Sequence, residues 1–168
     1  KGLFLNFDVL QNMQVSKVET QATRGIVRAK GYADAVQAIA TSLGIVTPSI
    51  NQLMRNLSGG NKQKSVLGKC VLADARLLLV NEPTRGIDVA AKAEVYRILY
   101  QLCKQGVGIL LVSSDLVELM ELSDQILVMS DGRIVASFDR GQASKEQILH
   151  AMMGHVANGS CKAGVADA

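Results

Sequence analysis

The chain has 168 residues, of which 48% are hydrophobic, 20% charged and only 4% aromatic, so it is long enough for one compact domain with an aliphatic core. Its formal net charge of +3 is small and no basic cluster accompanies it, which argues against nucleic acid as a partner. Its most apolar runs, such as Ile109–Val112, are far too short to span a membrane, and no charged-then-apolar leader opens it, so we expect a cytosolic protein with no direct membrane span.

The N-terminal half of the chain is predicted to be largely helical. Residues 1–12 have the pattern of a strand or a buried turn, with no start signal before them. Apolar residues recur at helical spacing over Tyr32–Leu43, and Gly44 is a natural end for that helix. A second helix is expected over Asn61–Ala73, with one apolar face formed by Val66, Leu67, Cys70 and Val71.

The following segment alternates between strands and helices. Leu77–Val80 is a short, continuous apolar run, which is typical of a buried parallel strand. Asp88 is placed to cap a helix that runs to about Lys104. Val107–Val112 is a second expected buried strand, and a short helix is expected over Asp115–Leu122. The buried stripe of the longer helix is predicted to be Ala91, Val95, Ile98, Leu99 and Leu102.

The C-terminal part is predicted to contain a hairpin and a last helix. Gln125–Met129 and Arg133–Ser137 flank Asp131-Gly132, a pair typical of a type I′ turn, in which both central residues need positive φ. Ser144 is expected to cap a helix over Lys145–Met153, and a frayed tail is expected over 154–168. Alternation of strands and helices predicts an α/β domain with a largely parallel sheet.

Cysteine and histidine positions predict neither a disulfide framework nor a metal site. Cys70, Cys103 and Cys161 are widely and irregularly spaced, and we expect Cys70 and Cys103 to be reduced packing residues. His150 lies in the last predicted helix and His155 in the tail, with no third ligand spaced to join them.

The segment Leu57-Ser58-Gly59-Gly60 immediately precedes a predicted helix. Two glycines leave the backbone N–H groups uncovered, the helix N-terminus adds a partial positive charge, and Ser58 adds a hydroxyl. These groups together predict a phosphate-binding surface. The simpler alternative is a loop with an N-cap, because glycine pairs at helix starts are common.

Polar residues also follow each of the two predicted parallel strands, at the sheet edge where ligands bind in α/β folds. Glu82 is a candidate for orienting a water against a terminal phosphate, and Asn81 occupies the place of a Mg²⁺ ligand, although a neutral amide binds Mg²⁺ poorly. Ser113-Ser114-Asp115 follows the second strand. The alternatives are that Glu82 caps a turn, that Asp88 is a bare N-cap and that the serines begin a helix.

One nucleotide-binding motif is absent from the sequence. There is no Gly-x-x-x-x-Gly-Lys-Ser/Thr, and Gly68-Lys69-Cys70, which comes closest, lacks the upstream glycine and the hydroxyl. The backbone cradle and lysine that fix the β- and γ-phosphates are therefore missing.

The order and spacing of these motifs over Asn56–Val89 resemble the ATP-binding cassette (ABC) family. LSGGNKQK (Leu57–Lys64) and NEPTRGIDV (Asn81–Val89) look like its sugar-importer branch, in which one polypeptide carries two cassettes in tandem, and the resemblance is closest to the second, C-terminal cassette. It implies a P-loop NTPase-like fold without its N-terminal strands and Walker A loop, which we expect to lie upstream of Lys1.

The resemblance implies a domain division and a role for each motif residue. Residues 1–153 would be a partial ATP-binding domain, with the helical subdomain and signature motif at about 13–60 and the Walker B to C-terminal part at 61–153. Ser58, Gly59 and Gly60 match the signature motif, which binds the γ-phosphate of ATP held by the opposite cassette. Glu82 matches the catalytic carboxylate, Asn81 the Mg²⁺-binding aspartate, Asp88 the D-loop aspartate and Ser114 the switch histidine.

The implied function is that of an ATP-binding subunit of a sugar importer, using ATP and Mg²⁺ at composite sites and working with a partner cassette and a membrane permease at the inner face of the membrane. The whole parent would be a monosaccharide-transporting ATPase, but we expect this chain alone to be inactive. The alternatives are a non-catalytic interaction module derived from a cassette, and a non-transport cassette, for which neither a coiled coil nor a basic linker is visible.

Overall fold

The structure is a computed structural model that describes residues 2–16 and 30–153. The predicted tail at 154–168, with His155 and Cys161, lies outside the described residues. The chain forms two compact units, Lys1–Leu110 and Leu111–Ala168. The division into subdomains at residue 60 that the resemblance implies stays a prediction.

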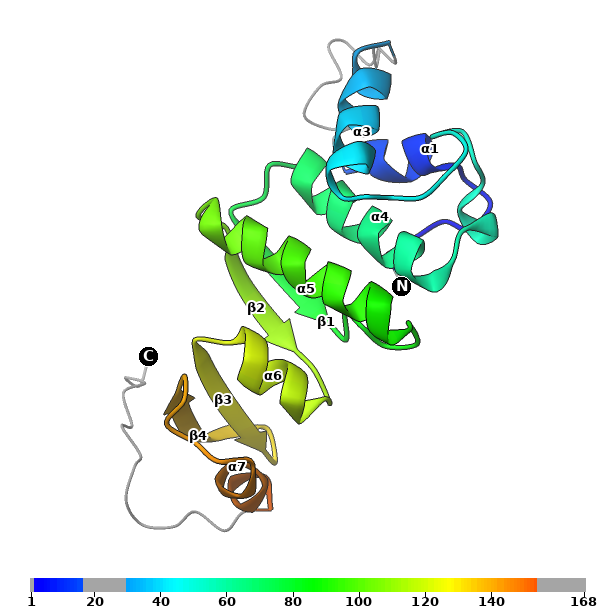
Figure 1. The fold of residues 1–168 in the computed structure, drawn as a ribbon. Coiled ribbons are helices and arrows are strands. Elements are labelled where there is room, and N and C mark those ends of the chain that lie inside the picture. Colours follow the sequence, from blue (N-terminus) through cyan, green and yellow to red (C-terminus); the bar gives the residue numbers. More distant parts are fainter. Residues whose placement is uncertain (1, 17–29, 154–168) are drawn as a thin grey trace. The chain divides into compact units, whose positions relative to one another are not determined.

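The first unit joins a group of helices to two neighbouring strands (Figure 1). Helices α1 (Val9–Gln14), α3 (Lys30–Ser42) and α4 (Gly59–Leu72) pack against one another, and α5 (Val89–Lys104) packs on α4. A short 3₁₀ helix, η1 (Met54–Asn56), precedes α4. The two predicted helices in this region are confirmed, and Gly44 ends the first of them with φ +60°.

Helix α4 is central to this packing, but its buried face differs from the predicted one. Its buried residues are Gly60, Lys64, Ser65, Leu67, Gly68 and Leu72, whereas Val66, Cys70 and Val71 are only partly covered. The apolar pattern predicted the wrong face because a glycine, Gly68, lies on the side of α4 where α1 and α3 approach most closely. A Cβ on Gly68 would lie 2.6 Å from Met13 Cε and 3.2 Å from Ile39 Cγ2. Partial burial raises the pKa of the Cys70 thiol, partly offset by Lys69 nearby.

The opening segment forms an exposed turn and a helix instead of a strand or a buried turn. Phe4 and Phe7 are about half exposed, and α1 follows with Asp8 as its N-cap. The Asp8 side chain accepts a hydrogen bond from Gln11 N, and the Gln11 side chain accepts one from Asp8 N. The Asp-x-x-Gln spacing of this capping box was the signal in the sequence that could have predicted the helix.

In the first sheet, one strand is buried on a single face and the other is only partly covered on a single face. Strands β1 (Leu77–Asn81) and β2 (Gly108–Val112) are neighbours in a parallel sheet, as predicted. Along β1, Leu78 and Val80 are buried while Leu77 and Leu79 are 61% and 74% exposed. The expected burial of β1 is therefore found on one face only, because the described residues cover a single face, the one on which α5 lies (Figure 1).

Helix α5 follows its predicted pattern. Asp88 accepts a hydrogen bond from Ala91 N at 2.9 Å, which confirms the predicted N-cap. Val95, Ile98, Leu99 and Leu102 are buried as predicted, and Ala91 is partly buried.

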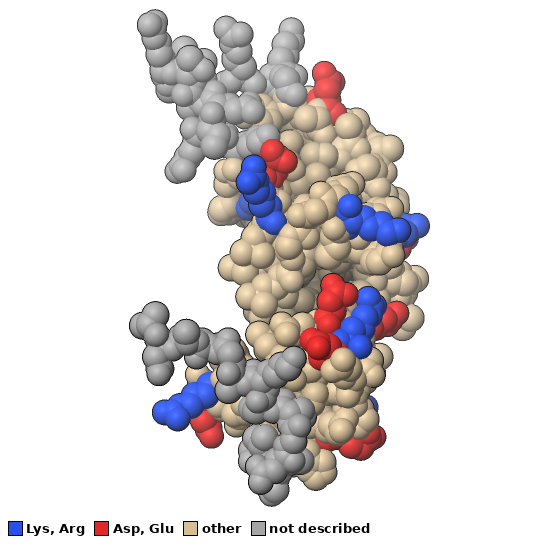
Figure 2. All heavy atoms as spheres, turned by 90° about the vertical axis from the view of Figure 1, so that its left-hand side faces the viewer, with Lys and Arg blue, Asp and Glu red and all other residues tan. Residues whose placement is uncertain are grey.

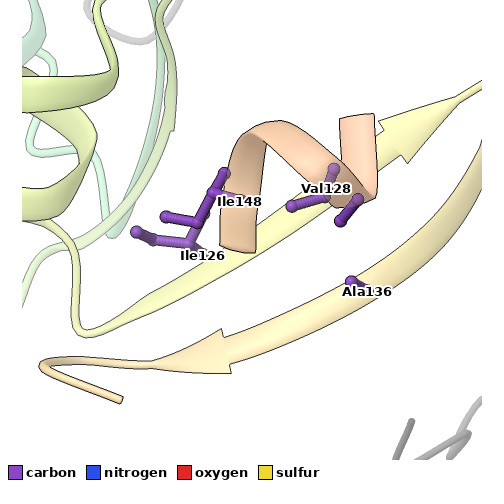
Figure 3. Packing of buried hydrophobic residues seen from close by; sticks show 5 residues of the cluster. Ile126, Val128, Ala136 and Ile148 are labelled. Carbon is purple, nitrogen blue, oxygen red and sulfur yellow. The ribbon is translucent and has the colours of Figure 1, made fainter. Parts of the chain in front are cut away.

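The second unit packs a hairpin against a helix. Strands β3 (Gln125–Ser130) and β4 (Arg133–Asp139) are antiparallel, and they are accompanied by α6 (Leu116–Leu122) and α7 (Lys145–Met152). Ile126 and Val128 of β3, Ala136 of β4 and Ile148 of α7 form its core (Figure 3). These side chains come from three elements and gather between the hairpin and α7, so burying them fixes α7 on the hairpin.

The predicted turn and cap in this unit are confirmed. Asp131 and Gly132 have φ of 49° and 75°, as a type I′ turn requires. Ser144 caps α7 and forms a capping box with Gln147. The register shifts once, between Val128 and Met129, where the hairpin has a bulge or irregularity.

Basic and acidic side chains are interspersed on the face that Figure 2 shows. Lys and Arg do not gather there into one patch, and the absence of a nucleic-acid partner stays a prediction. Among residues 2–16 and 30–153, no helix is both long and apolar enough to cross a bilayer.

Candidate phosphate-binding site

A hollow of about 210 Å³ in the first unit lies where the N-terminal ends of two helices meet. Two of the predicted phosphate-binding residues line it, together with the predicted D-loop residue. The full lining comprises Val46, Ser58, Gly60, Asn61, Lys64, Asp88, Ala90, Ala91 and Glu94. The fold thus brings together Ser58, Gly60 and Asp88, which are up to 30 residues apart in the sequence.

The first helix end at this hollow belongs to α4. Ser58 is its N-cap, with extended backbone angles of φ −62° and ψ 163°, and its hydroxyl accepts a hydrogen bond from Asn61 N at 3.3 Å. The amides of Gly59 and Gly60 belong to the first turn, whose N–H groups have no partner within the helix. Ser58 is therefore both the N-cap of the simpler alternative and part of a surface suited to an anion.

The second helix end belongs to α5, and a close contact joins it to the first. A Cβ on Gly60 would lie 2.6 Å from Ala91 Cβ, a distance that no pair of carbon atoms tolerates without movement. Gly59 is less tightly placed, since its Cβ would lie 3.3 Å from Ile87 Cγ2. Gly60 thus serves packing directly, because only a residue without a side chain lets the first turns of α4 and α5 touch.

Lys64 is a residue of this site that sequence reasoning did not single out. It is 4% exposed, its Nζ donates to Gly44 O at 2.7 Å, and it forms an ion pair with Glu94 of α5. Asn61, one turn earlier, accepts a hydrogen bond from Val46 N at 3.0 Å. The sequence held one signal: Lys64 lies four residues after Gly60 and therefore on the same face of the helix.

The predicted catalytic residues at the end of β1 do not line this hollow. Asn81 is the exposed last residue of β1, and Glu82 follows it with φ +49°. A left-handed conformation is unusual for glutamate and costs about 1 kcal/mol or more, so the surrounding turn must hold it. Arg85 N donates to Glu82 O at 3.3 Å within that turn. The catalytic and Mg²⁺-binding roles of Glu82 and Asn81 stay predictions.

The predicted switch position belongs to the second unit. Ser113 donates a hydrogen bond to the buried Glu118, accepts one from Asp115 N at 3.0 Å, and so fixes the start of α6. Asp115 is the N-cap of that helix. For Ser113 and Asp115 this agrees with the alternative that the segment begins a helix. The role of Ser114, which is exposed, stays a prediction.

Histidine, cysteine and carboxylate side chains that could hold a metal ion are scattered over the described residues, 2–16 and 30–153. No three His, Cys, Asp or Glu side chains among them are grouped to hold a metal ion. His150 is an exposed residue of α7.

Curated relatives of the chain are import proteins. A Pseudomonas savastanoi pv. phaseolicola protein, named for ribose/galactose/methyl galactoside import and ATP binding, is 38% identical over 154 residues, which are 92% of this chain and 29% of that protein. A ribose import ATP-binding protein of Streptomyces avermitilis is 40% identical over 149 residues, or 89% of this chain and 28% of that protein. The chain thus spans less than a third of the length of these relatives. No family model matches it.

Solved structures with the same fold are ATP-binding cassettes. An inward-facing metal-chelate type ABC transporter superimposes with a TM-score of 0.76 at 19% identity, covering 89% of this chain and 59% of that one. A dimeric cassette in a post-hydrolysis state, bound to ADP and phosphate, gives a TM-score of 0.69 at 17% identity, covering 82% and 58%. At these identities the likeness establishes the fold alone.

The fold is therefore that of an ABC ATPase, a P-loop NTPase with a mixed α/β architecture, as the sequence predicted. By sequence the chain is a member of the ABC family, homologous to part of its sugar-import ATP-binding proteins.

Proposed function

We propose that this chain is part of the ATP-binding subunit of an ABC-type sugar importer and supplies the signature half of a composite nucleotide site. One observation carries the proposal: Ser58, Gly60 and Asp88, at the capped ends of α4 and α5, line one hollow. Two helix N-termini directed at the same space favour a negatively charged group, and the names of the relatives point to ATP as its source.

The role of the hollow is to bind phosphate oxygens presented by another cassette. The backbone N–H groups of the first turn of α4 and the Ser58 hydroxyl would hold the γ-phosphate of ATP bound to that cassette, while Asp88 lies at the seam between the two. Such preorganised dipoles stabilise charge without having to rearrange during the reaction. The chain is thus expected to contribute to a site that it does not complete.

The catalytic half is expected to be weak in this chain. Glu82 would polarise the attacking water, but Asn81 stands where a carboxylate would hold Mg²⁺ through water, and a neutral amide is a poor substitute. Ser114 stands at the switch position, where a hydroxyl cannot carry the charge that an imidazole can. We therefore expect no Mg²⁺-dependent ATP hydrolysis by the isolated chain.

The remaining partners follow from the same assignment. The C-terminal cassette of a tandem importer subunit would work with the other cassette and with a membrane permease at the cytoplasmic face of the membrane. Closure of the two cassettes on ATP would be coupled to movement of the sugar through the permease.

A chimera tests this proposal. In the ribose import ATP-binding protein of Streptomyces avermitilis, the aligned segment is replaced by that of this chain, and ATP hydrolysis and ribose-dependent growth are measured in cells lacking their own importer. Two variants of Ser58 are compared. Ser58→Asn and Ser58→Asp both preserve an N-cap, but only aspartate puts a negative charge where the phosphate would bind.

We expect the Ser58→Asn chimera, which keeps a neutral cap but loses the hydroxyl, to retain part of the import, and the Ser58→Asp chimera to lose about 90% or more of both activities. Equal activity of the two variants would contradict the proposed phosphate role. A folded chimera that binds the permease regardless of nucleotide and supports no import would favour the alternative, a non-catalytic interaction module.

A further inference from the structure

The charges around the hollow oppose the ligand that it is proposed to bind. Asp88 and Glu94 contribute two carboxylates to its lining, and Lys64 is the single basic residue among the lining residues. Counting side chains alone, the lining carries a net charge of −1 with Lys64, and a phosphate group entering the space would face −2 without it. Helix dipoles offset only part of this repulsion, since each is equivalent to about half a unit charge.

Lys64 is built into the floor of the hollow instead of projecting into solvent. It is 4% exposed, and the ammonium donates to Gly44 O at 2.7 Å and pairs with Glu94. The Glu94 side chain remains 44% exposed. A buried ammonium bonded to both Gly44 O and Glu94 is held in one place, and the half-exposed Glu94 carboxylate would otherwise be free to turn toward the hollow.

The ion pair also extends the contact that shapes the site. Lys64 lies one turn after Gly60 on α4, and Glu94 lies one turn after Ala91 on α5, so the Gly60–Ala91 contact and the Lys64–Glu94 pair are successive contacts of one interface. The hydrogen bond from Lys64 to Gly44 O also connects α4 to the loop that contains Val46, whose N–H donates to the Asn61 side chain. One side chain therefore connects three segments at the hollow.

We propose that Lys64 is a positioning residue of the phosphate site, which neutralises Glu94 and holds it away from the bound phosphate. This inference rests on the proposed function for the identity of the ligand. This role predicts the direction in which each substitution changes the affinity for phosphate. If charge is what matters, removing Lys64 and removing the charge of Glu94 must change phosphate affinity in opposite directions, whereas loss of a mere structural tie would weaken binding in both cases.

The test uses the intact 168-residue chain and inorganic phosphate as the probe. Amide chemical shifts of Gly59, Gly60 and Asn61 are followed by NMR during a phosphate titration at constant ionic strength, with chloride as the reference anion. The variants are Lys64→Met, Lys64→Arg, Glu94→Gln and the double variant Lys64→Met/Glu94→Gln. Ser58→Asp serves as the control that blocks the site.

We expect Lys64→Met to weaken phosphate binding at least threefold and Glu94→Gln to strengthen it about threefold, because one unit charge is lost near the ligand in each case. The Lys64→Arg and double variants should stay within about twofold of the parent. Because Glu94 is half exposed, Glu94→Gln is expected to fold even if Lys64→Met does not. Weaker binding in Glu94→Gln, or no phosphate response at these amides in the parent chain, would overturn the inference.

The two proposals can fail separately. Import by the chimera depends on Ser58 and on a partner cassette, whereas the titration measures this hollow alone. Opposite shifts in phosphate affinity together with an inactive chimera would support the role of Lys64 and reject the transport function. An active chimera without opposite shifts in phosphate affinity would support the transport function and reject the role of Lys64.

Discussion

Gly60 shows how one residue of the proposed phosphate site is subject to two constraints, one from its amide and one from packing. Its amide belongs to the first turn of α4, which faces the hollow, and its missing side chain leaves room for Ala91 of α5. A substitution there would alter packing even if the amide stayed in place. The packing role can be measured without any ligand.

Gly60→Ala is expected to destabilise the chain by about 1–3 kcal/mol, because the new methyl group would lie 2.6 Å from Ala91 Cβ. Urea unfolding followed by circular dichroism measures the loss. Ala91→Gly introduced into the same variant should recover most of it, since it removes the clashing carbon. Gly59→Ala is the matched control, with an expected loss below about 1 kcal/mol because its nearest contact would be 3.3 Å. Equal losses at Gly59 and Gly60 would refute the close contact.

At the scale of elements, Asn12 holds the N-terminal turn on α1. Its side chain accepts from Phe4 N at 2.8 Å and donates to Phe4 O and Asp8 O, both at 2.9 Å. Asn12 is fully buried, so water cannot replace these partners. The buried Asn12 amide therefore helps to order the exposed turn that carries Phe4 and Phe7, together with the contact between the two rings and the backbone bonds from Met54 N to Phe7 O and from Arg55 N to Leu5 O.

Asn12→Ala is expected to cost about 2–3 kcal/mol, because it leaves buried backbone groups without partners. The neighbouring Gln11→Ala removes only the exposed half of the capping box and should cost about 1 kcal/mol or less. Free energies of unfolding from urea titration give both values. The Phe4 N–H donates a hydrogen bond to the Asn12 side chain, so its hydrogen exchange should accelerate in Asn12→Ala but not in Gln11→Ala. A Phe4 amide that stays protected in Asn12→Ala would contradict this role of Asn12.

At the scale of the whole molecule, the sheet of the first unit is apolar on both faces but buried on one. Leu78 and Val80 are covered, whereas Leu77, Leu79 and Leu110 are 61%, 74% and 52% exposed. Parallel strands normally have both faces covered, and the aliphatic composition of β1 fits that environment. The relatives are more than three times as long as the matched segment, so the homologous segment occurs there within a larger polypeptide.

Alanine substitutions on the two faces of β1 measure this asymmetry. Leu78→Ala is expected to cost about 2–5 kcal/mol and Leu79→Ala less than about 1 kcal/mol, because only the first leaves a cavity. Thermal and urea unfolding of the 168-residue chain compare the two. Similar losses at both positions would mean that the exposed face is covered in solution.

The sequence by itself determined the features that depend on a few neighbouring residues. The N-caps Ser58, Asp88 and Ser144 and the Asp131-Gly132 turn were all predictable, because each is decided by a backbone conformation and a hydrogen bond within about four positions. The motif order over Asn56–Val89 also predicted the fold, since that combination is far more specific than any of its parts.

Only the tertiary structure decided which side of each element is buried. Lys64 is buried because Gly44 and Glu94, which lie 20 and 30 residues away in the sequence, are brought to it by the fold. The buried face of α4 and the one-sided burial of β1 were likewise misjudged. Burial depends on which distant segments arrive and how closely, and a pattern of apolar residues along one segment carries no record of them.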